Sequence, residues 1–210
     1  MKRTIYILLT ALLLFIVLSV LLVVESAPIQ AFNHAIYAAI AELIAPFWTT
    51  ISVWIGEITR WYMYIPVILI LLLMPGTRVN VGLPLAITLP VSAVTGPILL
   101  KEIFAIERPD INQLVAEAGF GYPSGHSMNA AVFFGMCAVM VLRYSASKPL
   151  RIGFTAFAVA AILAVGLSRI YLGVHTATDV IGGYLAGTVV VCAALLAEEH
   201  LKNKRAASQE

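Results

Sequence analysis

Six runs of residues without Lys, Arg, Asp or Glu divide this chain and restrict what it can fold into. They cover residues 5–24, 61–74, 81–100, 126–142, 152–167 and 180–197. A helix needs about 20 apolar residues to cross the hydrocarbon core of a bilayer, and most of these runs approach or reach that length. The run at 61–74 is shorter, and we expect its helix to begin a few residues earlier. The pattern predicts an all-α integral membrane protein with six transmembrane helices.

The composition excludes an ordinary soluble domain. Hydrophobic residues make up 61% of the 210 residues and charged residues only 11%, whereas soluble domains carry about 25% charged residues. A chain of this length cannot bury so much apolar surface by itself, so lipid must cover the remainder. We expect a single membrane-embedded domain over residues 1–210. Cys137 and Cys192 fall inside predicted spans, which favours buried thiols over a disulfide or a metal site.

The first run, residues 5–24, follows Lys2 and Arg3. A signal peptide also has a basic start, but its apolar region is shorter and a small-residue cleavage site follows it. This run therefore indicates an uncleaved first span that starts in the cytoplasm.

Residues 27–60 are apolar but interrupted by prolines and polar residues. Trp48, Trp54 and Trp61 gather at the end of this segment, as is typical of a membrane–water boundary. We expect short interfacial helices in this first outer loop rather than a span. Whether the segment only packs as scaffold or also guides a ligand toward a site stays open. His34 lies here without a partner motif and is interpreted as structural or exposed.

The positive-inside rule supports this layout. With the N-terminus inside and six spans, nine of the thirteen basic residues fall on the cytoplasmic side: Lys2, Arg3, Arg78, Arg143, Lys148, Arg151, Lys202, Lys204 and Arg205. Both termini are then cytoplasmic, and residues 198–210 form a polar, basic tail. The four exceptions on the outer side are Arg60, Lys101, Arg108 and Arg169. Three of these four belong to polar clusters and are therefore expected to have another role.

Three polar clusters between residues 101 and 179 hold most of the chemistry of the chain, and each lies at one end of an apolar run. The clusters are Lys101 with Arg108-Pro109, Pro123-Ser124-Gly125-His126, and Ser168-Arg169 with His175 and Asp179. Folding the runs back and forth brings all three to the outer membrane face. Three cations, two histidines and one carboxylate then converge where lipid headgroups lie, an arrangement that suits phosphate-ester chemistry.

The first two clusters contain groups that bind anions. Arginine offers a planar fork to two phosphate oxygens, and lysine offers a compact charge. The first N–H groups of a helix also bind anions, Ser124 is a good N-cap, and Gly125 allows close approach of the backbone. His126 could give its proton to a departing oxygen. Two simpler readings stay open: Lys101 and Arg108 could anchor helices at the interface, and His126 could be incidental to a helix start.

In the third cluster, His175 and Asp179 are four residues apart and share a face if the chain is helical there. The carboxylate can then accept the N–H of one ring nitrogen and leave the lone pair of the other free. Histidine itself becomes the nucleophile in such an arrangement. The alternative is a His–Asp pair that only caps a helix.

Together, Lys101-x6-Arg108-Pro109, Pro123-Ser124-Gly125-His126 and Ser168-Arg169-x5-His175-x3-Asp179 resemble the three-part signature of the type-2 phosphatidic acid phosphatase superfamily. Every signature position is present, and the resemblance covers residues 101–179. It implies six transmembrane helices and a metal-independent, cofactor-free site at the outer face.

The resemblance also implies roles for the site residues. The groups that would hold the phosphate are Lys101, Arg108, Arg169, Ser124, the amide of Gly125, and Ser168. His175 would attack phosphorus to form a phosphohistidine, Asp179 would orient it, and His126 would protonate the leaving oxygen and then activate water. We expect a bell-shaped pH profile, activity that survives EDTA, and a lipid phosphate in the bilayer as partner, without nucleic acid or an obligate protein partner.

The motifs recognise the phosphate and leave the lipid tail open. Phosphatidylglycerol phosphate, undecaprenyl pyrophosphate and phosphatidic acid are all candidates. The compact chain is similar to bacterial phosphatases of the first two. A transporter that uses the same basic cluster to bind an anion or a lipid is the main alternative, although no predicted span carries an ionisable residue near its middle. A purely structural membrane protein is disfavoured by the paired histidines, and haloperoxidase chemistry, which the superfamily includes, by a site that opens to lipid.

Overall fold

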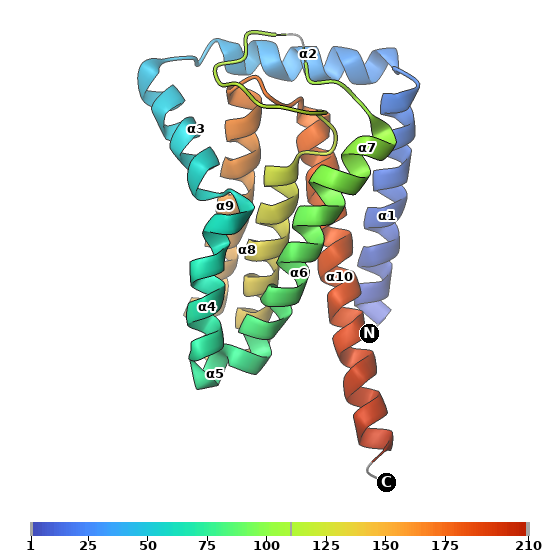
Figure 1. Cartoon of the computed structure of the whole chain (residues 1–210), viewed down its shortest axis with the longest axis vertical. Coiled ribbons are helices and arrows are strands. Elements are labelled where there is room, and N and C mark those ends of the chain that lie inside the picture. Colours follow the sequence, from blue (N-terminus) through green and yellow to red (C-terminus); the bar gives the residue numbers. More distant parts are fainter. Residues whose placement is uncertain (1, 110, 209–210) are drawn as a thin grey trace.

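The computed structural model describes residues 2–109 and 111–208, which form helices and no strand (Figure 1). The α-helices are α1 (Lys2–Val23), α2 (Ala27–Ala41), α3 (Pro46–Ile58), α4 (Ile65–Leu73), α5 (Pro75–Thr77), α6 (Leu83–Val94), α7 (Lys101–Phe104), α8 (Gly125–Tyr144), α9 (Lys148–Tyr171) and α10 (Ala177–Ala207). A 3₁₀ turn, η1 (Trp61–Tyr64), precedes α4, and two π-helical segments, η2 (Arg78–Gly82) and η3 (Thr95–Leu100), flank α6.

Five helical stretches in the described chain are long and apolar enough to cross a membrane, so this is a multi-pass membrane protein. They are Lys2–Val23, Pro75–Phe104, Gly125–Tyr144, Lys148–Tyr171 and Ala177–Lys204. A sixth candidate is the pair Pro46–Ile58 and Trp61–Leu73, which meet at a bend of 66°. The run at 61–74 therefore reaches spanning length only together with α3, and the count of six spans stays a prediction.

Residues 27–60 form two helices with different positions. α2 lies across one end of the bundle, next to the connection between α7 and α8 (Figure 1). α3 runs alongside α9 and buries Ser52 and Gly56 on one face. Both helices carry a proline in their first turn, Pro28 and Pro46, whose fixed φ suits this position. The expected pair of interfacial helices stays a prediction, because α3 also belongs to the bent sixth candidate.

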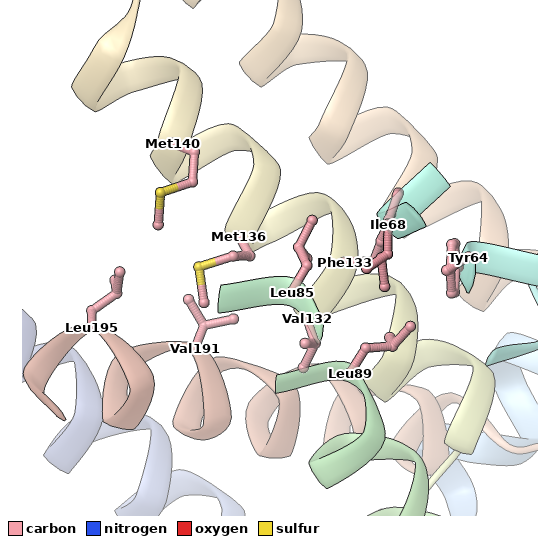
Figure 2. Packing of buried hydrophobic residues seen from close by; sticks show 10 residues of the cluster. All are labelled: Tyr64, Ile68, Leu85, Leu89, Val132, Phe133, Met136, Met140, Val191 and Leu195. Atoms are coloured by element: carbon pink, nitrogen blue, oxygen red, sulfur yellow. The ribbon is translucent and has the colours of Figure 1, made fainter. Parts of the chain in front are cut away.

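The core of the bundle is built around α8. More than half of its spanning stretch is buried, 56%, against 17% for α9. Figure 2 shows Val132, Phe133, Met136 and Met140 of α8 among apolar side chains of α4, α6 and α10. The outward faces of the other spanning helices carry exposed leucine, isoleucine and valine side chains, which lipid can cover.

Small residues let α10 cross α8 very closely. A Cβ added at Gly183 would lie 2.5 Å from the carbonyl oxygen of Ser124, and one at Gly187 would lie 2.8 Å from that of Met128. Gly183 and Gly187 thus form the G-x-x-x-G spacing by which membrane helices approach each other. This contact places the beginning of α10 beside the beginning of α8.

The basic tail is helical up to its last described turn. α10 continues through residues 198–207, and Glu198 accepts hydrogen bonds from Lys202 at 2.5 Å and from Arg143 at 3.0 Å. A Glu–Lys pair four residues apart on a helix stabilises it, and Arg143 ties this turn to the end of α8.

Candidate active site

A pocket of about 270 Å³ lies at the end of the bundle where α8 and α10 begin. Five of the nine predicted site residues line it: Lys101, Arg108, Gly125, His126 and His175. Asp179 lines a neighbouring pocket of about 310 Å³, which shares Arg108 and His175 with the first. The other three, Ser124, Ser168 and Arg169, are at most 3% exposed and lie outside the lining of both pockets.

Lys101 begins α7 and is almost completely buried. Its Nζ donates a hydrogen bond of 2.5 Å to the carbonyl oxygen of Phe120. Ala105, in the left-handed region with a φ of 48°, then ends the helix and starts the connection to α8. This lysine therefore holds the far end of the connection against the last turn of the long helical stretch 75–104.

Arg108 orders the connection and contacts the predicted nucleophile. Its guanidinium donates to the carbonyl oxygens of Ala118 at 2.9 Å, Gly119 at 3.0 Å and Val174 at 2.8 Å. Its Nη1 also lies 3.3 Å from Nε2 of His175. A guanidinium can only donate, so Nε2 accepts this bond and the proton of the neutral ring is on Nδ1.

Nδ1 of His175 lies beside Asp179, without the hydrogen bond that the sequence predicted. The distance from Nδ1 to Oδ2 is 3.4 Å, but the approach lacks hydrogen-bond geometry, and Nδ1 has no hydrogen-bond partner among the described residues. Oδ2 instead accepts from the backbone N–H of Thr176 at 2.8 Å, while the N–H of Asp179 donates to Oγ1 of Thr176 at 3.2 Å. The two residues form a capping box at the start of α10.

Burial lowers the pKa of His175 below its ordinary value of 6.5, and the neighbouring Asp179 carboxylate opposes this shift. The ring is 2% exposed. A neutral imidazole with the lone pair on Nε2 is the form that can act as a nucleophile.

A sharp turn between α9 and α10 places His175. Gly173 has a φ of 69° and follows the C-cap residue Leu172, a conformation that glycine adopts without strain. A Cβ at this position would also lie 2.7 Å from the carbonyl oxygen of Asn112. The connection between α7 and α8 thus packs directly on the turn that carries the histidine.

The second cluster forms the start of α8, as predicted. Ser124 is the N-cap of α8. Its Oγ accepts one hydrogen bond from the backbone N–H of Ser127 at 3.5 Å and another from the Oγ of Ser127 at 3.0 Å. The N–H of Ser124 donates to the carbonyl oxygen of Asp179 at 3.0 Å. Gly125 and His126 follow and line the pocket. The hydroxyl of Ser124 therefore serves the helix cap in this structure, and the pocket meets the next two residues.

Glu117, which the sequence reasoning did not single out, lies between two arginines. Its Oε2 is 3.7 Å from Nη2 of Arg108, and its Oε1 is 3.8 Å from Nη1 of Arg169. Arg169 also donates to Oγ of Ser168 at 3.2 Å and to the carbonyl oxygen of Ser52 at 3.1 Å. This carboxylate lines the pocket and bridges arginines that come from two separate motifs.

Two further contacts were missed because they join distant segments. Asn33 of α2 donates to Oγ1 of Thr178 at 2.8 Å and accepts from its N–H at 3.1 Å, which fixes α2 to the start of α10. Arg60 and the residues after it line the same pocket as His126. Two features of the sequence could have indicated these contacts: Asn33 is a polar residue in an apolar segment, and Arg60 is the fourth basic residue on the outer side.

The chain is similar in sequence to known proteins. The PAP2 superfamily model matches residues 80–201. Phosphatidylglycerophosphatase B from Bacillus subtilis is 43% identical over 94 residues, which cover 44% of this chain and 46% of that relative. The match thus spans about half the length of this relative. Undecaprenyl-diphosphatase from Sulfolobus acidocaldarius is 30% identical over 189 residues, with 84% of each chain covered.

The fold is also similar to a solved structure, described as the first transmembrane PAP2 type phosphatidylglycerolphosphate phosphatase from Bacillus subtilis. The TM-score is 0.81 at 27% identity, and the match covers 93% of this chain and 97% of the other. The family match spans more than half of the chain and includes all three polar clusters. The chain therefore belongs to the PAP2 superfamily.

Proposed function

We propose that this protein is an integral-membrane lipid phosphatase that releases the terminal phosphate of a phospholipid or a polyprenyl diphosphate. The observation that supports this most is the shared pocket of Arg108, His126 and His175, three residues from three separate motifs. Phosphoryl transfer depends mainly on positioning and on stabilising charge. Buried cations around a neutral histidine provide both.

In the first step, Nε2 of His175 attacks phosphorus and forms a P–N bond. The P–O bond to the leaving group breaks, and its electron pair stays on the leaving oxygen, which takes a proton from His126. Lys101 and Arg108 bind the phosphoryl oxygens, and Asp179 stabilises the positive charge that develops on the ring through Nδ1–H. Arg108, which donates to Nε2 of His175, donates to the phosphate instead once substrate enters.

In the second step, water attacks phosphorus and gives a proton to the now neutral His126. The P–N bond breaks, and its electron pair returns to Nε2 of His175. The products are inorganic phosphate and the lipid alcohol or lipid monophosphate. Arg169 donates a hydrogen bond to Ser168 and contacts Glu117, which in turn contacts Arg108, so Arg169 helps to hold Arg108 in position.

The names of the relatives favour two substrates, phosphatidylglycerol phosphate and undecaprenyl diphosphate. A groove between α3 and α9, lined by Leu43, Trp48, Ile55 and Leu167 among others, supplies an apolar surface of the kind a lipid tail could occupy. A transporter of an anion or a lipid through the same cluster is the alternative. Uptake of labelled anion by proteoliposomes, unaffected by His175→Ala, would favour it.

The test is phosphate release from a panel of lipid phosphates in detergent. We expect His175→Ala to lower kcat by more than about 10⁴-fold, because the nucleophile is lost. His126→Ala should lower it by about 10²–10⁴-fold, the usual contribution of a general acid. His200→Ala, on the exposed last turns of α10, is the matched control and should match the wild type. Equal release by all four proteins would contradict the assignment.

Metal independence is tested in the same assay. We expect phosphate release to continue in EDTA, because Lys101, Arg108 and the start of α8 supply the positive charge that Mg²⁺ supplies in other phosphotransfer enzymes. Loss of activity on chelation, followed by recovery with Mg²⁺, would contradict this part of the proposal.

A further inference from the structure

The end of α3 is fixed to the active site by a close helix contact. Arg169 of α9 donates to the carbonyl oxygen of Ser52 at 3.1 Å, and a Cβ at Gly56 would lie 2.1 Å from Nη2 of the same arginine. Ser52, Gly56 and Thr59 are buried at successive turns of α3. The chain that leaves this helix therefore starts from a position set by Arg169.

Arg60 is the first residue after Thr59, the C-cap of α3, and it lines the pocket together with Trp61 and Tyr62. Its positive charge disfavours a positive charge on both His126 and Arg169. Its side chain is 40% exposed and forms a bidentate salt bridge with Glu57. Nε donates to Oε2 at 2.9 Å, and Nη2 donates to Oε1 at 2.8 Å. The only carboxylate partner of Arg60 at hydrogen-bond distance among the described residues is Glu57, three residues earlier in the last turn of α3.

The position of Arg60 is informative because the proposed reaction has two sides. In that reaction His175 attacks the phosphorus that is transferred, whereas His126 protonates the leaving oxygen. Atoms beyond the leaving oxygen therefore lie on the His126 side of the pocket. Arg60 lines the same pocket, and its charge acts on His126 but is not among the charges that act on His175. When the substrate is a phosphate monoester of a neutral alcohol, this side receives no charge. When the leaving group carries a phosphate of its own, this side receives one or two negative charges.

We propose that Arg60 selects substrates whose leaving group carries a second phosphate. This inference rests on the proposed lipid phosphatase function and deepens it. The planar guanidinium that now binds the Glu57 carboxylate through two parallel bonds can bind two oxygens of a phosphate in the same way. The second phosphate replaces Glu57 as the partner of Arg60. In a diphosphate it also becomes a better leaving group, because the charge that develops on it is stabilised.

Two matched substrate pairs test this proposal. The first pair is farnesyl diphosphate and farnesyl phosphate, which share a tail and differ in the second phosphate. The second pair is phosphatidylglycerol phosphate and phosphatidic acid. In phosphatidylglycerol phosphate a glycerol unit separates the second phosphate from the one that is released, and phosphatidic acid has no second phosphate. We expect Arg60→Ala to lower kcat/KM by about tenfold or more for at least one doubly phosphorylated substrate, because a charge-assisted pair is lost. For farnesyl phosphate and phosphatidic acid, kcat/KM should change by less than about threefold, because removing an exposed charge that contacts no substrate group has a small effect.

The four arms also show which spacing Arg60 recognises. If Arg60→Ala lowers kcat/KM only for farnesyl diphosphate, Arg60 binds a second phosphate that carries the leaving oxygen itself. If kcat/KM falls only for phosphatidylglycerol phosphate, Arg60 binds a second phosphate that lies beyond the glycerol unit. Glu57→Gln, which weakens the competing pair, should lower KM for the substrate that Arg60→Ala affects. Arg60→Lys should recover part of the loss.

Arg143→Ala is the matched control, because Arg143 is 38% exposed and pairs with Glu198 at 3.0 Å at the opposite end of α8. It should leave all four values unchanged. An equal fall for all four substrates with Arg60→Ala, or no fall for any, would overturn the role of Arg60 alone. A wild-type protein that hydrolyses none of the four would overturn the proposed function itself.

Discussion

At the scale of single residues, His175 is controlled by two opposing influences. Burial lowers the pKa of its ring below 6.5, and the carboxylate of Asp179 at 3.4 Å from Nδ1 raises it. Because burial is the larger influence, the ring stays neutral, and able to attack phosphorus, at pH values below the ordinary pKa of histidine. Activity should therefore be lost on the acidic side only at a pH below 6.5.

Asp179→Asn gives the first prediction at this scale. Removing the carboxylate removes the influence that raises the pKa of His175, so the acidic limb of kcat/KM should move to still lower pH while the overall rate falls. The profile is measured with one substrate for both proteins, so that ionisation of the substrate cancels. Glu198→Gln, near the far end of α10, should leave the limb in place. A limb that moves to higher pH would contradict the assigned role of Asp179.

Glu117 gives the second prediction. Its carboxylate is 23% exposed and lies 3.7 Å and 3.8 Å from Arg108 and Arg169, so an incoming phosphate competes with it for the arginines. Partly exposed ion pairs contribute up to about 1 kcal/mol. Glu117→Gln should therefore lower the inhibition constant of inorganic phosphate by about two- to fivefold.

The control for this prediction is Glu107→Gln, a charge change in the same connection at an exposed residue outside the lining of the 270 Å³ pocket. It should alter phosphate inhibition less than Glu117→Gln. If Glu117→Gln instead weakened phosphate binding, the carboxylate would be holding the arginines in place rather than competing for them.

At the scale of elements, the apolar runs predicted most of the helices, because hydrophobic length decides which segments can cross lipid. The runs at 126–142, 152–167 and 180–197 lie inside α8, α9 and α10, and the run at 5–24 ends one residue beyond α1. α3 was the exception. Its apolar residues and tryptophans suit a helix on the membrane surface as well as one along the bundle. Packing against α9 decides that it lies along the bundle.

The same distinction applies to the site. Three motifs that are each local in sequence named nine site residues, and five of these line the 270 Å³ pocket. Glu117 and Arg60 were not predicted, because their importance comes from contacts with residues of other segments. The Gly183 to Gly187 spacing was visible in the sequence, but its partner on α8 is defined only by the crossing of two helices.

The contact between α3 and α9 gives a prediction at the element scale. Gly56→Ala places a methyl group against the guanidinium of Arg169, which is buried and flexible only at its end. The side chain should move rather than the helices, so activity falls more than stability. A displacement of about 1 Å in an active site can cost about 10²-fold in rate, and we expect a loss of this order in kcat/KM with a small change in Tm.

Gly153→Ala on α9 is the matched control, because a Cβ at this position meets no atom within 4 Å. Alanine is favoured over glycine inside a helix by about 1 kcal/mol, so this variant should be as stable as the wild type or more stable, with unchanged kcat/KM. A similar loss of activity in both variants would show that the close contact at Gly56 does not position Arg169.

At the scale of the whole molecule, the two ends of the bundle differ in charge and in structure. One end carries the pocket, α2 and the connection between α7 and α8 (Figure 1). The loop between α8 and α9 lies at the other end, between Arg143 and Lys148, and α10 carries Lys202 and Lys204 beyond it. The positive-inside rule assigns the basic end to the cytoplasm, and the pocket is then predicted to face the outside.

Single-cysteine labelling tests this orientation. With Cys137 and Cys192 replaced by serine or alanine, Gln113→Cys places a thiol on the exposed connection beside the pocket, and Ala146→Cys places one on the exposed loop between α8 and α9. We expect a membrane-impermeant maleimide to label Gln113→Cys in intact spheroplasts and Ala146→Cys only after the membrane is permeabilised. Retained phosphate release would show that each variant is folded. Labelling of Ala146→Cys alone in intact spheroplasts would place the pocket on the cytoplasmic side, where it could act only on lipid phosphates of the inner leaflet.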